Sequence, residues 1–105
     1  TPWQSPDGES AWHLYILRLQ LEQLNVGRDQ IFQELWDRGI GVNIHYIPVY
    51  YHAYYRDLGY AKGLCPQAEE LFEAMLTIPL YPAMKEAALE RVIDTVLAVV
   101  KSHLR

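Results

Sequence analysis

Residues 66–82, PQAEELFEAMLTIPLYP, join a helical pattern directly to a strand pattern. Pro66 suits the first turn of a helix, and apolar side chains then recur at helical spacing over 66–74. The short apolar run at 75–78 ends at Pro79, which restricts the residue before it to extended backbone. This stretch therefore predicts a helix followed at once by a strand, so the fold mixes both kinds of element.

Two further strands are predicted on the N-terminal side of this stretch. Residues 11–20, AWHLYILRLQ, carry large apolar groups on both alternating faces, as in a strand that is covered on two sides. Residues 41–47, GVNIHYI, alternate in character until Pro48, which lacks an amide donor, ends the run. Between them, residues 25–39 have the apolar spacing of a helix, with Gly39 at the position of a C-terminal cap.

The C-terminal half of the chain adds an aromatic loop and a long helix. Residues 49–64 are expected to form the loop, with a short helical turn around 53–58, because Gly59 and Gly63 disfavour a long element. The helix is expected over 85–103, where apolar residues again recur at helical spacing. Its predicted buried side chains are Leu89, Val92, Ile93, Val96, Leu97, Val100 and Leu104.

Together these elements predict an α+β domain in which a three-stranded, at least partly antiparallel sheet is covered by helices. A chain of 105 residues has room for one hydrophobic core. The polar stretch at 1–10 contains the proline and glycine typical of linkers. We therefore assign the domain to residues 11–105 and expect the chain to be a piece of a longer protein.

The composition disfavours several functional classes. With 50% hydrophobic and 21% charged residues, the chain is too apolar for intrinsic disorder. Its formal net charge of -4 opposes nucleic-acid binding, and its apolar runs are far shorter than the roughly 20 residues that cross a membrane. The single Cys65 cannot form an internal disulfide, so we expect a cytoplasmic location and a buried, structural cysteine.

The strongest candidate for a binding site is the run 45–52, HYIPVYYH, at the end of the predicted strand 41–47. Histidine and tyrosine side chains can stack on a flat ring and orient hydroxyl or phosphate groups. The alternative interpretation is that these aromatic groups attach the loop to a small core, as tyrosines commonly do. The candidate substrate-binding residues are His45, Tyr46, Tyr50, Tyr51 and His52.

Other patterns of catalytic or metal-binding residues are weak or missing in the sequence. His45, His52 and Cys65 do not have the spacing of a zinc site, and a fourth ligand is missing. The sequence contains neither a G-x-S-x-G turn nor a glycine-rich phosphate loop. Cys65 precedes a helix N-terminus, where a thiolate is stabilised, but a structural role is favoured over a nucleophilic one. The acidic side chains of the 66–74 helix are interpreted as a solvated face: Glu69, Glu70 and Glu73.

Short motifs recur along nearly the whole chain in a specific order. They are AWHLY at 11–15, RGIGV at 38–42, HYIPV at 45–49, YRDLG at 55–59, CPQAE at 65–69, IPLYPAM at 78–84 and RVI at 91–93. In this order they resemble the small C-terminal domain of nucleotide-sugar aminotransferases of the DegT/StrS type. The run HYIPVY at 45–50 is most similar to the branch that aminates a 4-keto-6-deoxy-hexosamine nucleotide, such as the transaminase for pseudaminic acid precursors.

The resemblance implies an enzyme of fold type I that uses pyridoxal phosphate to transfer an amino group, usually from glutamate, to a keto-sugar nucleotide. In that family the Schiff-base lysine and the acidic partner of the cofactor belong to a large N-terminal domain. Lys62, Lys85 and Lys101 are the only lysines here, and none lies in a matching motif. The chain alone is therefore expected to bind no cofactor and to be inactive, with the large domain and a second subunit of a homodimer as its partners.

The resemblance also ranks the candidate residues. His45 and Tyr46 match the family segment that faces the active-site mouth, whereas Tyr50, Tyr51 and His52 lie in a loop that varies within the family. An alternative function, of a different class, is a stand-alone binding or interaction module that uses the aromatic loop.

Overall fold

The computed structural model describes residues 2–105 as an α+β fold, which confirms the predicted class. Its strands are β1 (Tyr15–Arg18) and β2 (Met75–Ile78). Its helices are α1 (Arg28–Asp37), α2 (Ala53–Asp57), α3 (Pro66–Ala74) and α4 (Glu86–Ser102), with single 3-10 turns at Leu21–Gln23 and Val49–Tyr51.

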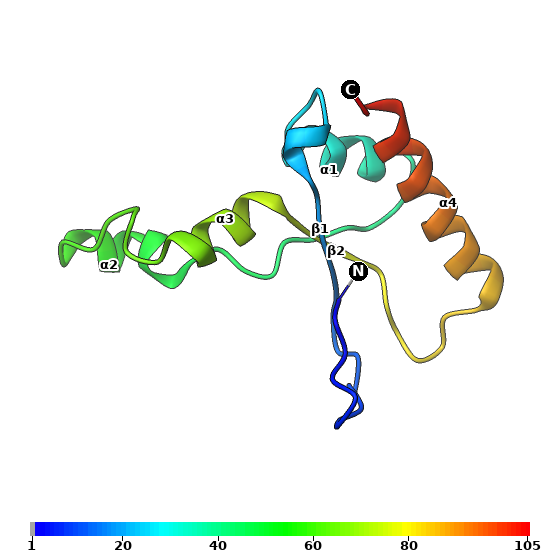
Figure 1. The fold of residues 1–105 in the computed structure, drawn as a ribbon, viewed down its shortest axis with the longest axis horizontal. Helices are drawn as coiled ribbons and strands as arrows, with labels where there is room; N and C mark the ends of the chain where they lie inside the picture. Colours follow the sequence, from blue (N-terminus) through cyan, green and yellow to red (C-terminus); the bar gives the residue numbers. More distant parts are fainter. Residues whose placement is uncertain (1) are drawn as a thin grey trace.

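The sheet is a pair of antiparallel strands at the centre of the molecule (Figure 1). Tyr15 pairs with Ile78 and Arg18 pairs with Met75, so all four residues of each strand take part. The chain passes directly from α3 into β2, as the pattern at 66–78 predicts. Strand β1 is shorter than the predicted 11–20, and the residues before it are outside the ladder.

The prediction of a third strand at 41–47 is wrong for the described residues. Asn43 forms an isolated antiparallel bridge with Thr77, through amide-to-carbonyl bonds of 3.0 and 2.8 Å. The next amide, that of Ile44, donates to the side-chain Oδ1 of Asn43 at 2.8 Å. A side chain that takes a backbone donor in this way competes with a strand ladder. Pairing therefore stops after one residue, and the chain leaves the sheet toward Pro48.

Helices α1 and α4 pack against each other on one side of the sheet, whereas α2 and α3 form an arm on the other side (Figure 1). The hydrophobic core lies between α1, α4 and β2. Its fully buried side chains are Ile31, Leu35, Val42, Leu76 and Val99. The core therefore anchors β2 through Leu76 and the bridge at Asn43 through the neighbouring Val42, whereas the α2–α3 arm extends away from the core.

Helix α4 buries only some of the apolar side chains that the sequence predicts to be buried. Val92 and Val96 lie in the core, but Leu89, Ile93 and Leu97 are 41%, 44% and 46% exposed. Residues four apart lie on one face of a helix, so these three side chains form a continuous apolar stripe. The prediction that they are buried is wrong, because α1 covers the other face of α4. Leu104 is also exposed.

Gly39 ends α1 in the left-handed conformation, with φ of +74°. A Cβ atom at this position would lie 3.1 Å from Nη2 of Arg91, which donates to the Arg38 carbonyl at 3.0 Å. Gly39→Ala should therefore lower the free energy of unfolding by about 1 kcal/mol. Chemical denaturation measures this change. Gly41→Ala is the control, because a Cβ there meets nothing within 4 Å. Equal losses in the two variants would contradict this role for Gly39.

Candidate functional site

His45 is attached to the edge of the sheet through Thr77. Its ring Nδ1 lies 2.9 Å from the Thr77 hydroxyl, and Thr77 is only 5% exposed in the middle of β2. The bridge between Asn43 and Thr77 places His45 there, because it fixes the backbone two residues earlier. The imidazole is half-buried, so one side of it is available to a ligand.

A cavity of about 220 Å³ opens beside this imidazole. The polar side chains that line it are those of His13, Asn43, His45 and Thr77, and its apolar wall comes from Leu14 and residues 78–80. Such a set offers neutral hydrogen-bond donors and acceptors but no carboxylate or ammonium group. The arrangement therefore suits the binding of hydroxyl or phosphate oxygens.

Tyr46 lies next to His45 and is 68% exposed. The two rings meet edge to face with their centroids 4.7 Å apart. Because it projects from the molecule, the Tyr46 ring is free to contact a bound sugar or base.

Tyr50 belongs to a separate cluster on the arm. Its hydroxyl donates to Glu69 Oε1 at 2.6 Å, and the Gly63 amide donates to both Glu69 oxygens at 2.7 and 2.9 Å. The hydrogen bond from Tyr50 holds the pKa of Glu69 below its ordinary value, and the Gly63 amide adds to this effect. Burial, together with the Glu69 carboxylate, raises the pKa of Tyr50. The Glu69 carboxylate thus joins both ends of the aromatic loop to α3.

The assignment of Glu69 to a solvated helix face is wrong, since the residue is 5% exposed. Helical periodicity places it among charged neighbours and gives no sign that the loop folds back over it. Cys65, predicted to be buried, is instead exposed at the start of α3. The Cys65 amide lies 3.4 Å from Glu69 Oε1, so the same carboxylate also accepts from the turn before the helix.

Tyr51 packs its ring between those of Tyr50 and Phe72, at centroid distances of 5.2 and 6.1 Å. Its hydroxyl is buried without a partner among residues 2–105, and burial raises its pKa. Tyr50 and Tyr51 thus attach the loop to α3, in keeping with the alternative interpretation of the aromatic run. His52 is exposed, and its carbonyl accepts the amides of Tyr55 and Arg56 at the start of α2.

The five candidates therefore occupy two places. His45 lines the cavity with Tyr46 beside it, whereas Tyr50 and Tyr51 contact α3 and His52 precedes α2. Three further residues that share the cavity with His45 were not predicted from the sequence: His13, Asn43 and Thr77. The alternating pattern at 41–47 and the strand pattern at 75–78 could have suggested that these two segments pair. The register that brings Asn43 opposite Thr77, however, cannot be derived from one short strand.

Comparison with known proteins decides the family. The sequence pattern of the DegT/DnrJ/EryC1/StrS aminotransferase family matches residues 1–97. This chain belongs to that family. It is 37% identical over 103 residues to the spore coat polysaccharide biosynthesis protein SpsC of Bacillus subtilis, a match that covers 96% of this chain and 26% of SpsC.

Solved structures of aminotransferases share this fold. The putative sugar aminotransferase Spr1654 from Streptococcus pneumoniae, in its PLP form, has a TM-score of 0.77 at 33% identity, over 89% of this chain and 24% of its own. TlmJ from Streptoalloteichus hindustanus has a TM-score of 0.80 at 27% identity, over 96% of this chain and 25% of TlmJ. Helicobacter pylori PseC, at 24% identity, shares the fold with a TM-score of 0.77, over 86% of this chain and 24% of PseC. The chain thus spans about a quarter of the length of these relatives.

The three lysines of this family member lie at three separate places in the fold. Lys62 pairs with Glu73 at 2.6 Å, which raises the pKa of the ammonium group. Lys85 precedes α4, and Lys101 lies in its last turn. None of the three lines the His45 cavity. A pyridoxal enzyme needs a lysine in contact with the cofactor, and that this lysine lies outside this chain stays a prediction.

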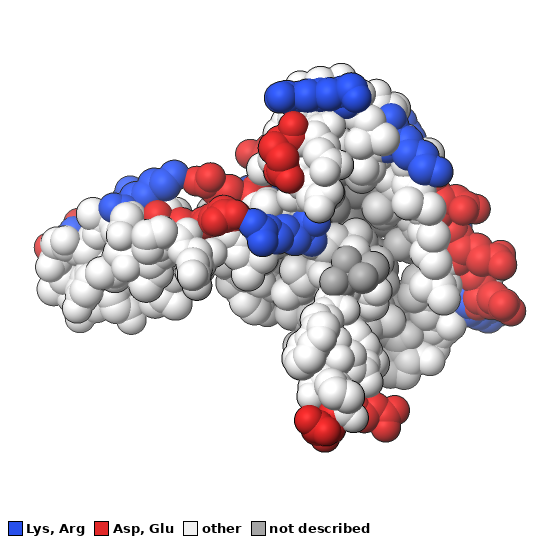
Figure 2. Space-filling view, viewed as in Figure 1, with Lys and Arg blue, Asp and Glu red and all other residues white. Residues whose placement is uncertain are grey.

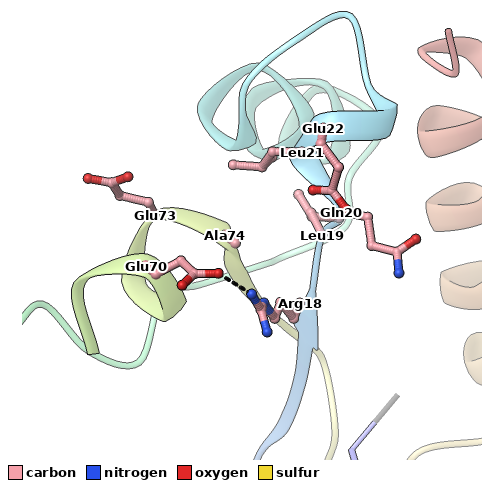
Figure 3. Close-up of a pocket in the computed structure, with 8 residues that line it drawn as sticks. All are labelled: Arg18, Leu19, Gln20, Leu21, Glu22, Glu70, Glu73 and Ala74. Atoms are coloured by element: carbon pink, nitrogen blue, oxygen red, sulfur yellow. Dashed lines mark hydrogen bonds and ion pairs between the residues drawn. The ribbon is translucent and has the colours of Figure 1, made fainter. Parts of the chain in front are cut away.

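A larger cavity of about 440 Å³ lies between the end of β1 and α3 (Figure 3). Arg18 and Glu70 face each other across it and form an ion pair, and Glu73 and Glu22 complete its charged rim. None of the five candidate residues lines it. Because its one cation is already paired with a carboxylate, this cavity is a weaker candidate than the one beside His45.

The outer surface of α4 divides into a charged part and an apolar part. Acidic side chains lie along the edge of the molecule that α4 forms (Figure 2). The exposed stripe of Leu89, Ile93 and Leu97 instead borders a hollow of about 420 Å³, together with Tyr15 and Leu17 of β1. Within residues 2–105, no helix is both long and apolar enough to span a membrane.

Proposed function

We propose that residues 11–105 are the C-terminal small domain of a pyridoxal-phosphate-dependent aminotransferase, with 1–10 as the linker that precedes it. The full-length enzyme transfers an amino group from glutamate to a keto-sugar nucleotide. Family membership supports this proposal, as do structural neighbours described as sugar aminotransferases. The observation that carries it is the cavity beside His45, which presents neutral polar groups suited to sugar and phosphate oxygens.

In this proposal the domain supplies the substrate-side wall of the active site. His45 donates a hydrogen bond to the ligand, and Tyr46 covers the ligand with its exposed ring. Tyr50 and Tyr51 act by holding the loop on α3, and His52 lies at the exposed end of that loop. The cofactor, bound elsewhere in the full-length enzyme, supplies the electron sink for amino transfer.

The apolar face of α4 is the proposed contact with the rest of the enzyme. Leu89, Ile93 and Leu97 are each more than two-fifths exposed and border an apolar hollow. Such a face is typical of an interface. The relatives are about four times as long as the aligned segment, since 26% of SpsC is covered. We assign this face to the large N-terminal domain and propose that the full-length enzyme is a homodimer.

The proposed substrate belongs to the 4-keto-6-deoxy-hexosamine nucleotides, on the resemblance of residues 45–50 to the pseudaminic acid branch. The fold shared with Helicobacter pylori PseC is compatible with this branch. No observation on residues 2–105 favours the alternative of a stand-alone interaction module.

The test compares the full-length enzyme with this chain alone. Each is mixed with pyridoxal phosphate, glutamate and a 4-keto-6-deoxy-hexosamine nucleotide. The full-length enzyme should show a visible cofactor band and form the amino sugar, whereas the chain alone should do neither. A cofactor band in the chain alone that disappears on replacing Lys62, Lys85 or Lys101 would contradict the proposal. So would a full-length enzyme that binds the cofactor but aminates no keto-sugar nucleotide.

A further inference from the structure

The contact between Thr77 and His45 determines which ring nitrogen of His45 faces a ligand. The Thr77 hydroxyl lies 2.9 Å from Nδ1, and Thr77 is 5% exposed. A buried hydroxyl that donates to nothing loses the free energy of its hydrogen bond to water. Among residues 2–105, His45 Nδ1 is the one hydrogen-bond partner of this hydroxyl. Donation from the hydroxyl to Nδ1 satisfies the hydroxyl within the protein, whereas the reverse direction would leave it without a protein acceptor.

A neutral imidazole carries one proton, so an acceptor at Nδ1 requires the proton on Nε2. Within the described residues Nε2 makes no hydrogen bond, and His45 lines the 220 Å³ cavity. The ring therefore presents an N–H donor to the cavity. A donor at this point recognises an oxygen acceptor, either a hydroxyl oxygen or a phosphate oxygen.

We propose that Thr77 is a positioning residue that holds the neutral His45 imidazole with its proton on Nε2, so that the ring donates to an oxygen of the sugar nucleotide. This inference rests on the proposed function for the identity of the ligand. It assigns His45 a binding role and excludes the role of proton acceptor at Nε2. Thr77 acts through His45, because its own hydroxyl is occupied by Nδ1.

The first measurement is the ¹⁵N chemical shift of the His45 ring in the full-length enzyme at pH 8, with histidine labelled and His45→Gln used for assignment. Wild type and Thr77→Ser should both show a protonated Nε2 and an unprotonated Nδ1. Thr77→Val, which has a similar shape but no hydroxyl, should lose this preference. A proton on Nδ1 in wild type, or identical spectra for wild type and Thr77→Val, would overturn the proposal.

The second measurement is the dissociation constant of UDP-N-acetylglucosamine, with UDP as a second probe. Thr77→Val should weaken binding by about 3- to 10-fold and Thr77→Ser by less than about 2-fold, since one hydrogen bond becomes less well oriented. A loss for both probes assigns the acceptor to phosphate, and a loss for the sugar nucleotide alone assigns it to the sugar. If Thr77→Val keeps wild-type affinity for both, the positioning role is wrong.

The two measurements separate the failure of this inference from the failure of the proposed function. Wild-type spectra as predicted, together with no probe binding to the wild-type enzyme, would contradict the function but leave the Thr77 contact intact. Weaker binding in His45→Ala with an unchanged spectrum in Thr77→Val would contradict the positioning role but leave the function intact.

Discussion

Glu69→Ala should loosen residues 49–65 while the α1–α4 core stays intact. In the wild-type chain this carboxylate accepts from the Tyr50 hydroxyl and from the Gly63 amide. Removal of it leaves both donors unpaired in a half-buried site. Hydrogen bonds to a charged group are among the stronger ones, so amide exchange in this segment should rise about 10- to 100-fold. Hydrogen exchange with mass spectrometry on the peptide 49–65 measures the change.

The same segment should respond to pH through Glu69. Because the hydrogen bond from Tyr50 lowers the pKa of Glu69, the folded loop favours the charged carboxylate. Its stabilising effect is present above the ordinary pKa of glutamate and is lost as pH falls through the lowered pKa. Glu69→Gln should remove this acid-side loss, since glutamine does not titrate.

Glu70→Ala is the matched control for both experiments. Glu70 lies on the same helix but is exposed and pairs with Arg18 on the surface. Such pairs contribute little to stability, so exchange over 49–65 should change by less than about 2-fold. Equal effects of Glu69→Ala and Glu70→Ala would show that the buried network does not hold the loop.

The helices and strand β2 were predictable from the sequence because their signals are local. Pro66 and the helical spacing of apolar residues after it predict α3, and the short apolar run that follows at 75–78 predicts β2. The loss of the expected third strand at 41–47 was not predictable, because it depends on which acceptor takes the Ile44 amide. The Asn43 side-chain oxygen accepts the Ile44 amide, and the hydrophobic periodicity of the sequence does not indicate such a hydrogen bond.

The candidate site was predictable only in part. The aromatic run indicated His45 and Tyr46 as candidates, and their role in binding stays a prediction. Thr77 lies 32 positions later and looks like an ordinary strand residue, so its contact with His45 needs the tertiary structure. The burial of Glu69 was missed for a similar reason, because its carboxylate accepts from the Gly63 amide in the preceding loop and not from its own helix.

His45→Ala should weaken sugar-nucleotide binding to the full-length enzyme by about 5- to 150-fold, or about 1–3 kcal/mol. The variant removes the donor that the cavity presents to the ligand. It also leaves the Thr77 hydroxyl without its acceptor, but the neighbouring bridge between Asn43 and Thr77 uses backbone groups and remains. The visible band of the bound cofactor should not change, since the proposed function places the cofactor in the large N-terminal domain.

His45→Gln provides the graded control. Its side-chain amide can place a donor near the position of Nε2, so affinity should fall between those of wild type and His45→Ala. A purely structural role for His45 predicts a different order, in which both variants lower the melting temperature and neither changes affinity.

The most direct test of the account is therefore the dissociation constant of a 4-keto-6-deoxy-hexosamine nucleotide for wild type, His45→Gln and His45→Ala, with the melting temperature of each sample measured alongside. The account predicts progressively weaker binding in that order, with melting temperatures within about 2 °C of one another. Unchanged affinity in His45→Ala, accompanied by a lowered melting temperature, would contradict it.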